Sequence, residues 1–419
     1  MKKRFSKLFN SRVFSSIKWL YPGMGVKRWI LLGSFGILLI IIGSLKFQAE
    51  PLIIVKILSV VVVICGVILL VMSVKRMLRS IITIFLPHHE VELADIMYKQ
   101  RHLGRGVRIV TIGGGSGLSV LLSGLKEYTS NISAIVTVAD DGGSSGRLRE
   151  QFDILPPGDI RNCLVALADA PALMRDLFQF RFKKGSEFSE HSFGNLFITV
   201  MTQLTGDFEK AIKESSKVLA IRGQVIPSTL DNVVLGATYK DGSTAQGEAQ
   251  IPKAYKPIEK VYLNPASATA APDAIKAIEQ ADIIVLGPGS LYTSIIPNLL
   301  IKDITDALVA SDAIKAYVCN AMTQHGETDS FSASEHLKVL LRHSHPKVVD
   351  YCIVNNGKVP EELLERYKQE YAYPIIADGN KIGAMGYKVI EANIITTSDY
   401  VRHDQAKLAK IIMGLLEEE

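Results

Sequence analysis

The chain has 419 residues, of which 48% are hydrophobic, and a formal net charge of +5. The first 106 residues hold 16 Lys and Arg against 4 Asp and Glu, whereas the remainder holds 31 against 38 and is acidic. An acidic main part argues against a nucleic-acid-binding protein. The four cysteines have no C-x-x-C or Cys/His spacing, so we expect reduced structural thiols.

The N-terminal region contains two apolar runs that predict membrane helices. Trp29–Leu45 carries no charge, and Leu52–Val74 carries only Lys56. A helix needs about 20 residues to cross the hydrocarbon core, so each run is long enough or nearly so. A cleaved signal is disfavoured because the preceding basic region spans 28 residues and no cleavage site leads into a mature domain. The sequence therefore predicts a two-helix transmembrane hairpin over residues 29–74.

The charges around this hairpin predict its orientation. Residues 1–28 contain eight Lys and Arg and no acid, and three more basic residues follow the second run at 75–79. The positive-inside rule then places both termini in the cytoplasm. We expect a basic cytoplasmic N-terminus (1–28), a juxtamembrane linker (75–106), and a two-pass protein of the inner (cell) membrane whose basic residues face anionic lipid.

Strand-like and helix-like segments alternate from Val107 onward. The expected strands are short and rich in β-branched residues, and they lie at 107–112, 132–139, 232–239, 282–287, 313–320 and 348–355. This alternation predicts one α/β domain over 107–419 with a Rossmann-like, doubly wound and mainly parallel sheet. The polar segment 239–264 is expected to be an inserted hairpin or small subdomain.

A glycine-rich loop follows the first expected strand and opens a helix. Its candidate ligand-binding residues are Gly113, Gly114, Gly115, Ser116 and Gly117. Backbone N–H groups in such a turn, together with the positive end of the helix, form a natural anion site. The dinucleotide fingerprint G-x-G-x-x-G is broken, because Leu118 stands where its last glycine would fall. The ligand class is therefore open at this point.

A second such loop follows the second expected strand and begins with two carboxylates. Asp140 and Asp141 are candidate ligands for Mg²⁺, which prefers oxygen donors and bridges phosphates. The residues that could hold a second anion are Gly142, Gly143, Ser144, Ser145 and Arg147. A polar loop with Asx-type turns is the alternative, but two glycine-rich loops after consecutive strands favour a ligand site.

Further candidates follow along the chain. Asp159 in "PPGDIRN" is well placed to cap a helix, and it could also orient a ligand together with Asn195 of "HSFGNLF". A third glycine loop follows the strand at 282–287 and supplies Gly287, Gly289 and Ser290. Additional polar contacts are expected from "NAMTQHGET" and from "YVRHD" near the C-terminus.

Taken together, these motifs resemble the gluconeogenesis factor family (YvcK-like), a branch of the superfamily that includes the 2-phospho-L-lactate transferases (CofD-like). The stretches that carry the resemblance are "TIGGGSGLS", "VTVADDGGSSGRLR", "PPGDIRNCLVALA", "FGNLF", "RGQVIPST", "GPGSLYTSIIPNLL", "MTQHGET" and "YVRHD". The resemblance implies a Rossmann-like fold that binds nucleotide-linked ligands. In the transferase branch an aspartate matching Asp140 or Asp141 helps to hold a divalent metal.

The resemblance also implies a function. The gluconeogenesis factor branch binds UDP-sugars, notably UDP-N-acetylglucosamine, and supports cell-wall synthesis and cell shape on gluconeogenic carbon sources. By motif, its sugar-nucleotide contacts fall on Tyr367 and Arg402. We therefore expect a membrane-tethered UDP-sugar-binding regulator. Its expected partners are cell-wall synthesis proteins and further copies of itself, with no nucleic acid.

Two other functions remain to be weighed. A Mg²⁺-dependent transferase with a nucleotide diphosphate-linked donor would use the same loops, but we find no obvious aromatic cluster to stack a deazaflavin acceptor. A nicotinamide oxidoreductase is disfavoured by the broken glycine spacing. The sequence identifies no catalytic residue.

Overall fold

The computed structural model describes residues 27–49, 51–85, 103–183, 185, 188–397 and 400–416. The chain divides into two compact units, Met1–Lys99 and Gln100–Glu419, and each is described by itself. The predicted basic N-terminus, apart from its last two residues, and residues 86–102 of the predicted linker lie outside the described residues.

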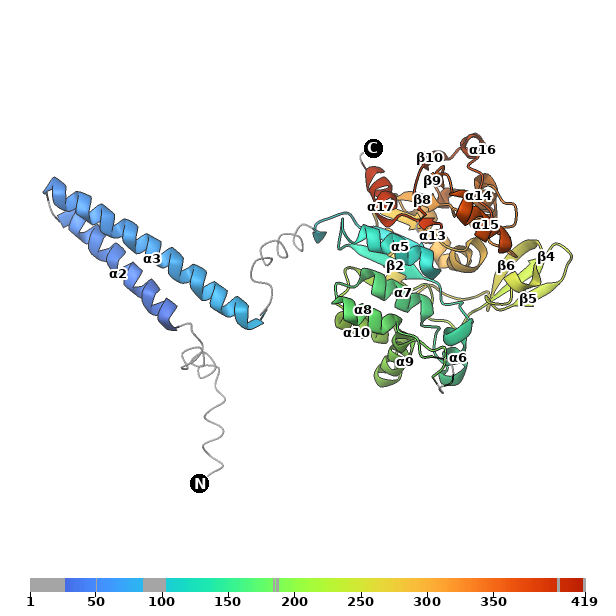
Figure 1. Cartoon of the computed structure of the whole chain (residues 1–419), viewed down its shortest axis with the longest axis horizontal. Coiled ribbons are helices and arrows are strands. Elements are labelled where there is room, and N and C mark those ends of the chain that lie inside the picture. Colours follow the sequence, from blue (N-terminus) through green and yellow to red (C-terminus); the bar gives the residue numbers. More distant parts are fainter. Residues whose placement is uncertain are drawn as a thin grey trace, which may run out of the picture. The chain divides into compact units, whose positions relative to one another are not determined.

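Two long helices make up the described part of the first unit (Figure 1). α2 (Lys27–Ala49) and α3 (Ile53–Phe85) pack closely where two glycines meet, because a Cβ on Gly36 would lie 2.8 Å from the Gly66 carbonyl oxygen. Large apolar side chains point outward, with Ile54 78% exposed. Small-residue contacts inside an apolar exterior are typical of membrane helices. Both helices are long and apolar enough to be candidate membrane spans.

α3 continues past the apolar run, which ends at Val74, to Phe85. No glycine or proline occurs between these two positions, so nothing in the sequence ends the helix there. The Arg76 guanidinium lies over the Trp29 ring of α2, 4.9 Å from its centroid, and joins the two helices by a cation–π contact. The first part of the predicted linker is therefore helical.

Seven parallel strands form the central sheet of the second unit (Figure 1), in the order β10-β9-β8-β7-β1-β2-β3. The strands are β1 (Ile109–Gly113), β2 (Ile132–Val136), β3 (Gln224–Pro227), β7 (Ile283–Leu286), β8 (Ile314–Val318), β9 (Tyr351–Asn355) and β10 (Lys388–Ala392). The strand order reverses between β1 and β7, and open α/β sheets bind ligands at such a switch point. The predicted Rossmann-like, doubly wound sheet is confirmed.

Helices flank the sheet, and most of them contribute to one large hydrophobic core, whereas Leu363, in the helix Glu361–Gln369, belongs to a second, smaller cluster. They are α5 (Gly115–Leu125), α6 (Gly143–Phe152), α7 (Gly158–Leu167), α8 (Ala172–Gln179), α9 (Phe193–Thr205), α10 (Phe208–Leu219), α11 (Pro272–Glu279), α12 (Ile296–Leu299), α13 (Lys302–Ala310), α14 (Ala333–Arg342), α15 (Glu361–Gln369), α16 (Gly379–Ala384) and α17 (Gln405–Gly414). Every residue of β1, β7 and β8 is buried, which explains why their sequences are mostly apolar.

A small antiparallel sheet is inserted between β3 and β7. It comprises β4 (Val234–Tyr239), β5 (Thr244–Gln246) and β6 (Ile258–Asn264), with β4 in the centre. The predicted insert at 239–264 is present, but it begins earlier, because the run 232–239 forms β4 and not a strand of the main sheet. A short apolar run has the same sequence pattern in a main-sheet strand and in a strand of a small inserted sheet. The edge strand of the main sheet beside β2 is instead β3, which has four residues and ends in proline.

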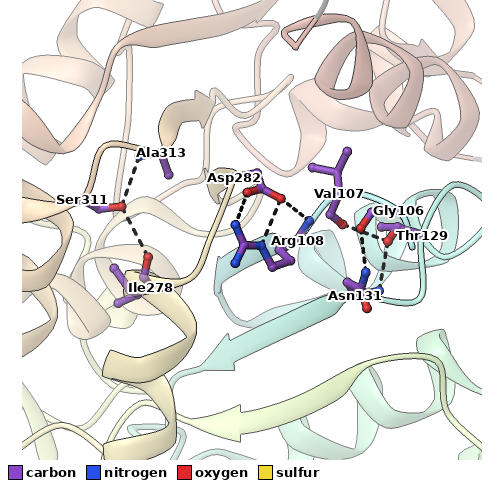
Figure 2. A network of polar contacts seen from close by, with 9 residues as sticks. All are labelled: Gly106, Val107, Arg108, Thr129, Asn131, Ile278, Asp282, Ser311 and Ala313. Atoms are coloured by element: carbon purple, nitrogen blue, oxygen red, sulfur yellow. Dashed lines mark hydrogen bonds and ion pairs between the residues drawn. The ribbon is translucent and has the colours of Figure 1, made fainter. Parts of the chain in front are cut away.

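A polar network holds the beginnings of the strands, at the opposite end of the sheet from the glycine loops (Figure 2). The Arg108 backbone and guanidinium both donate to Asp282 at the start of β7, the backbone N–H at 2.8 Å. Asn131, at the start of β2, donates from its side-chain amide to the Gly106 carbonyl oxygen at 2.6 Å. These bonds fix the segment before β1 between its two neighbouring strands.

Candidate functional site

Two glycine loops meet at the switch point of the sheet. The first consists of Gly113 at the end of β1, Gly114, and the first turn of α5 with Gly115, Ser116 and Gly117. The second follows β7 and consists of Gly287, Pro288, Gly289 and Ser290. A Cβ on Gly117 would lie 2.7 Å from the Pro288 carbonyl oxygen, so the loops touch through their backbones. Gly115 and Gly287 have φ of +69° and +80°, a region that favours glycine.

A cleft of about 430 Å³ opens beside these loops. Its walls include seven predicted ligand-binding residues, namely Gly115, Ser116, Gly117, Gly289, Ser290, Tyr367 and Arg402. Asn320, Gln324, His325 and His403 also line it. The backbone N–H groups at the start of α5 give this wall a positive potential. The cleft therefore joins two phosphate-type loops to residues from the C-terminal part of the chain.

Tyr367 and Arg402 are held together by the backbone between them. The Val401 backbone N–H donates to the Tyr367 hydroxyl at 3.0 Å, so α15 positions the strand that follows. That strand, β12 (Arg402–His403), pairs with β11 (Ile395–Thr396). The Arg402 guanidinium lies 5.2 Å from the centre of the Tyr400 ring. Tyr367 thus has a positioning role, whether or not it also contacts a ligand.

His403 lines the same cleft but is tied to the sheet. Its Nε2 lies 3.2 Å from the Cys319 carbonyl oxygen after β8. Burial lowers the pKa of His403 to about 4, so the ring is neutral at physiological pH. Gln324 supports the second glycine loop, because its side-chain amide donates to the Ser290 hydroxyl at 2.7 Å.

Asp159 lies behind the first glycine loop. The predicted helix cap is wrong: α7 begins at Gly158, and Asp159 is inside its first turn, where no side-chain cap bond forms. Its carboxylate instead accepts the Gly115 backbone N–H, and a Cβ on Gly114 would lie 2.5 Å from it. Burial, followed by the charge of Asp140, raises the pKa of Asp159 to about 6. Asp159 therefore fixes the shape of the phosphate-type loop.

The two adjacent aspartates of the second predicted loop point to different partners. Asp140 accepts the Gly142 backbone N–H at 2.8 Å and a bond from the Ser145 hydroxyl, and burial raises its pKa. Asp141 accepts the backbone N–H of Ala249 in the insert at 2.9 Å. Asp140 thus belongs with Asp159 beside the first loop, whereas Asp141 holds the insert in place.

The remaining predicted residues divide around the start of α6. Ser144 lies 3.0 Å from the His191 ring and accepts a bond from the Asn195 side-chain amide at 3.0 Å. Gly142 precedes α6, and Gly143, its first residue, has φ of +45°. Arg147 does not line the cleft, because its guanidinium donates to the carbonyl oxygen of Ser189 and to Glu190. Ser144 and Asn195 form a buried polar pair next to Asp140 and its loop.

Two glutamates near this group, the half-buried Glu248 and the buried Glu327, were not predicted. Burial, followed by the charges of Asp140 and Asp159, raises the pKa of Glu248 in the insert to about 8. Burial also raises the pKa of Glu327, after β8, to about 7. Thr293 donates to one Glu327 oxygen at 3.3 Å, and the other has no partner among the described residues. Each glutamate follows a glycine in a polar stretch. This pattern is typical of an exposed turn, so the sequence does not indicate that these side chains are shielded from solvent. Among the described residues, no three His, Cys, Asp or Glu side chains are arranged to hold a metal ion by themselves.

Comparison with known proteins places this arrangement in a family. Residues 109–395 match the model of 2-phospho-L-lactate transferase CofD. The gluconeogenesis factor of Bacillus subtilis is 47% identical over 317 residues, which cover 75% of this chain and all of that protein. A longer relative from Nostoc is 45% identical over 423 residues and covers 96% of this chain and 93% of itself.

A crystal structure of a UPF0052-family protein from Bacillus halodurans agrees with the fold. It superposes with a TM-score of 0.72 at 45% sequence identity and covers 74% of this chain and 99% of its own. Relatives of this length correspond in size to the second unit alone, and the Bacillus halodurans protein folds at that length. With the family model matching most of the sheet and both glycine loops, the chain belongs to the CofD family and, within it, to the gluconeogenesis factors.

Proposed function

We propose that this protein binds a nucleotide diphosphate-linked sugar, with UDP-N-acetylglucosamine as the first candidate, and regulates cell-wall synthesis and cell shape from the membrane. The observation that supports this is the convergence of both glycine loops and Arg402 on one cleft. Backbone N–H groups at the start of α5 would receive one phosphate. The Arg402 guanidinium would add a charged donor for a second phosphate or for the sugar.

The helical hairpin gives this binding protein its location. α2 and α3 would hold the second unit at the cytoplasmic face of the cell membrane, with both termini in the cytoplasm. Basic residues at one end of α3 would contact anionic lipid. Membrane-bound cell-wall synthesis proteins and further copies of the chain are the partners that this location favours.

A Mg²⁺-dependent transferase of the phospholactate type is the second candidate. The family match and the half-buried Asp140 and Asp159 beside Gly114 favour it. Mg²⁺ is commonly bound by one or two carboxylates together with ligand phosphates and water, so these residues fit such a site without a third protein ligand. Asp140 would hold the ion, which would neutralise charge on the diphosphate. Asp141 is less suited because its carboxylate is directed to the insert, where it accepts the Ala249 N–H, and not to the first glycine loop.

Calorimetry of residues 100–419 tests the proposal. UDP-N-acetylglucosamine, GDP and NAD would each be titrated with and without Mg²⁺. We expect UDP-N-acetylglucosamine to bind, and Arg402→Ala to weaken it at least about tenfold, as for loss of a charge-assisted bond. Arg108→Ala is the matched control, because Arg108 lies at the opposite end of the sheet. Binding of NAD alone would contradict the proposal, and metal-dependent breakdown of the diphosphate ligand would favour the transferase.

A further inference from the structure

The His325 ring is clamped between two tyrosines at the wall of the cleft. Its centre lies 4.7 Å from that of Tyr255 on one face and 4.7 Å from that of Tyr371 on the other, with interplanar angles of 29° and 28°. Nδ1 lies 2.9 Å from a carboxylate oxygen of Asp329. Both faces and one nitrogen of the His325 ring are therefore in contact with protein side chains, and the edge that carries Nε2 is available for a further contact.

Three separate chain segments build this clamp. Tyr255 ends a turn of 3₁₀ helix (Pro252–Ala254) in the insert, Tyr371 follows α15, and His325 lies in the loop after β8. The loop and the insert touch, since a Cβ on Gly326 would lie 2.0 Å from the Pro252 carbonyl oxygen. The position of the ring thus depends on tertiary packing and not on one local turn.

Both tyrosines adopt a backbone conformation that side-chain-bearing residues rarely use. Tyr255 has φ of +51° and Tyr371 φ of +56°. They are 64% and 60% exposed, so burial of their rings in a core does not explain them. Each tyrosine adopts this conformation at the end of a helix, Tyr255 as the C-cap of the 3₁₀ turn and Tyr371 two residues after α15, and each thereby places an exposed ring against His325.

The partner of Nδ1 defines what Nε2 can do. An ionised carboxylate only accepts hydrogen bonds, so Nδ1 carries the proton, and in the neutral ring Nε2 is an acceptor. Nε2 makes no hydrogen bond to any residue that the structure describes, and the side chain is 34% exposed beside the glycine loops. An acceptor on this wall complements the donors that the loops supply for phosphate.

We propose that His325 is a ligand-contacting residue whose Nε2 accepts a hydrogen bond from a hydroxyl of the bound sugar nucleotide. This rests on the proposed function, which supplies a ligand with hydroxyls on both its ribose and its sugar. Tyr255, Tyr371 and Asp329 act as positioning residues that fix the plane and the tautomer of the ring.

Calorimetry of the full-length protein with UDP-N-acetylglucosamine and with UDP tests this contact. His325→Phe keeps a flat ring between the tyrosines and removes the acceptor, so we expect about tenfold weaker binding, the loss of one hydrogen bond. Weaker binding of both ligands assigns the contact to a ribose hydroxyl, and weaker binding of UDP-N-acetylglucosamine alone assigns it to the sugar. Tyr371 is exposed, so Tyr371→Leu can be made without disturbing the core. It should weaken binding of whichever ligand His325→Phe affects, by a smaller factor.

His345→Phe is the matched control, since His345 is exposed and its side chain bonds only the Lys347 backbone N–H among the described residues. It should bind both ligands like the wild type. If His325→Phe also binds both ligands like the wild type, the contact is refuted while the proposed function stands. If the wild type binds neither ligand, the proposed function fails, and the His325 contact fails with it.

Discussion

Replacing Glu327 by Gln should stabilise the second unit above neutral pH and leave its stability almost unchanged in acid. The side chain is 8% exposed, and burial raises its pKa to about 7 from the ordinary 4.5 of a glutamate. Below pH 4.5 Glu327 is protonated in both the folded and the unfolded state, so it does not destabilise the fold. Above pH 7 it is ionised in both states, and the destabilisation reaches its full value. The difference between the two pKa values corresponds to about 3 kcal/mol.

The Glu327→Gln variant removes only the negative charge, because glutamine has the shape of glutamate and keeps a side-chain oxygen that accepts hydrogen bonds. Thr293 and the Tyr292 backbone N–H both donate to the carboxylate, and an amide oxygen can accept both bonds. The amide nitrogen takes the place of the oxygen without a partner, as the acidic proton of the neutral acid also would.

Urea unfolding of residues 100–419 at pH 5 and pH 8.5 measures the effect. We expect Glu327→Gln to exceed the wild type's free energy of unfolding by less than about 1 kcal/mol at pH 5 and by about 3 kcal/mol at pH 8.5. Asp159 and Glu248 also have raised pKa values, so the comparison must be with the wild type at each pH. The exposed Glu150→Gln is the control and should show no pH-dependent difference. A variant that is less stable at both pH values would refute the reasoning.

Three further changes test other parts of the structure. Gly117→Ala should weaken UDP-N-acetylglucosamine binding at least about tenfold in calorimetry while the melting temperature stays within a few degrees, because its Cβ would lie 2.7 Å from the backbone of the second glycine loop. Asp141→Ala should speed hydrogen exchange in residues 234–264 but not in the main sheet, since it removes the acceptor that holds the Ala249 N–H and costs about 1 kcal/mol. Gly66→Leu should make the hairpin protease-sensitive in detergent micelles, because even a Cβ there would lie 2.7 Å from the backbone of α2. Unchanged exchange or proteolysis would contradict the last two.

The strands of the sheet could be predicted where both faces are buried. β7 is an unbroken run of apolar residues and β1 is interrupted only by Thr111, since helices cover both sides of the sheet. The edge strands lack that signal: β3 has four residues and a terminal proline, and β10 is half-exposed and includes Lys388 and Glu391. The sequence could therefore define the centre of the sheet and the glycine loops that follow it, but not its edges.

The two walls of the cleft also differ in how far the sequence could predict them. Gly115 and Gly289 could be predicted because a glycine loop directly after a buried strand is a local signal. Tyr367 and Arg402 followed only from the family resemblance, because their place depends on how α15 and β12 pack against the sheet. Glu327 gave no signal at all, since its burial is decided by the insert and the turn after β7 and not by its neighbours in sequence.

The carboxyl groups of Asp140, Asp159 and Glu248 also bear on the choice between the two proposed functions. Asp140, Asp159 and Glu248 interact through their charges, and burial raises the pKa of each, so the fold favours their protonated or cation-neutralised forms. A diphosphate on the first glycine loop would bring further negative charge next to Asp159, which bonds the same loop from behind. Proton uptake by these carboxyls, or a divalent cation that accompanies the ligand, would favour its binding. By linkage, cation and ligand would then raise each other's affinity by the same factor. A regulator could work with protons alone, whereas a transferase needs the cation, so the metal dependence of binding separates the two functions at this one group of side chains.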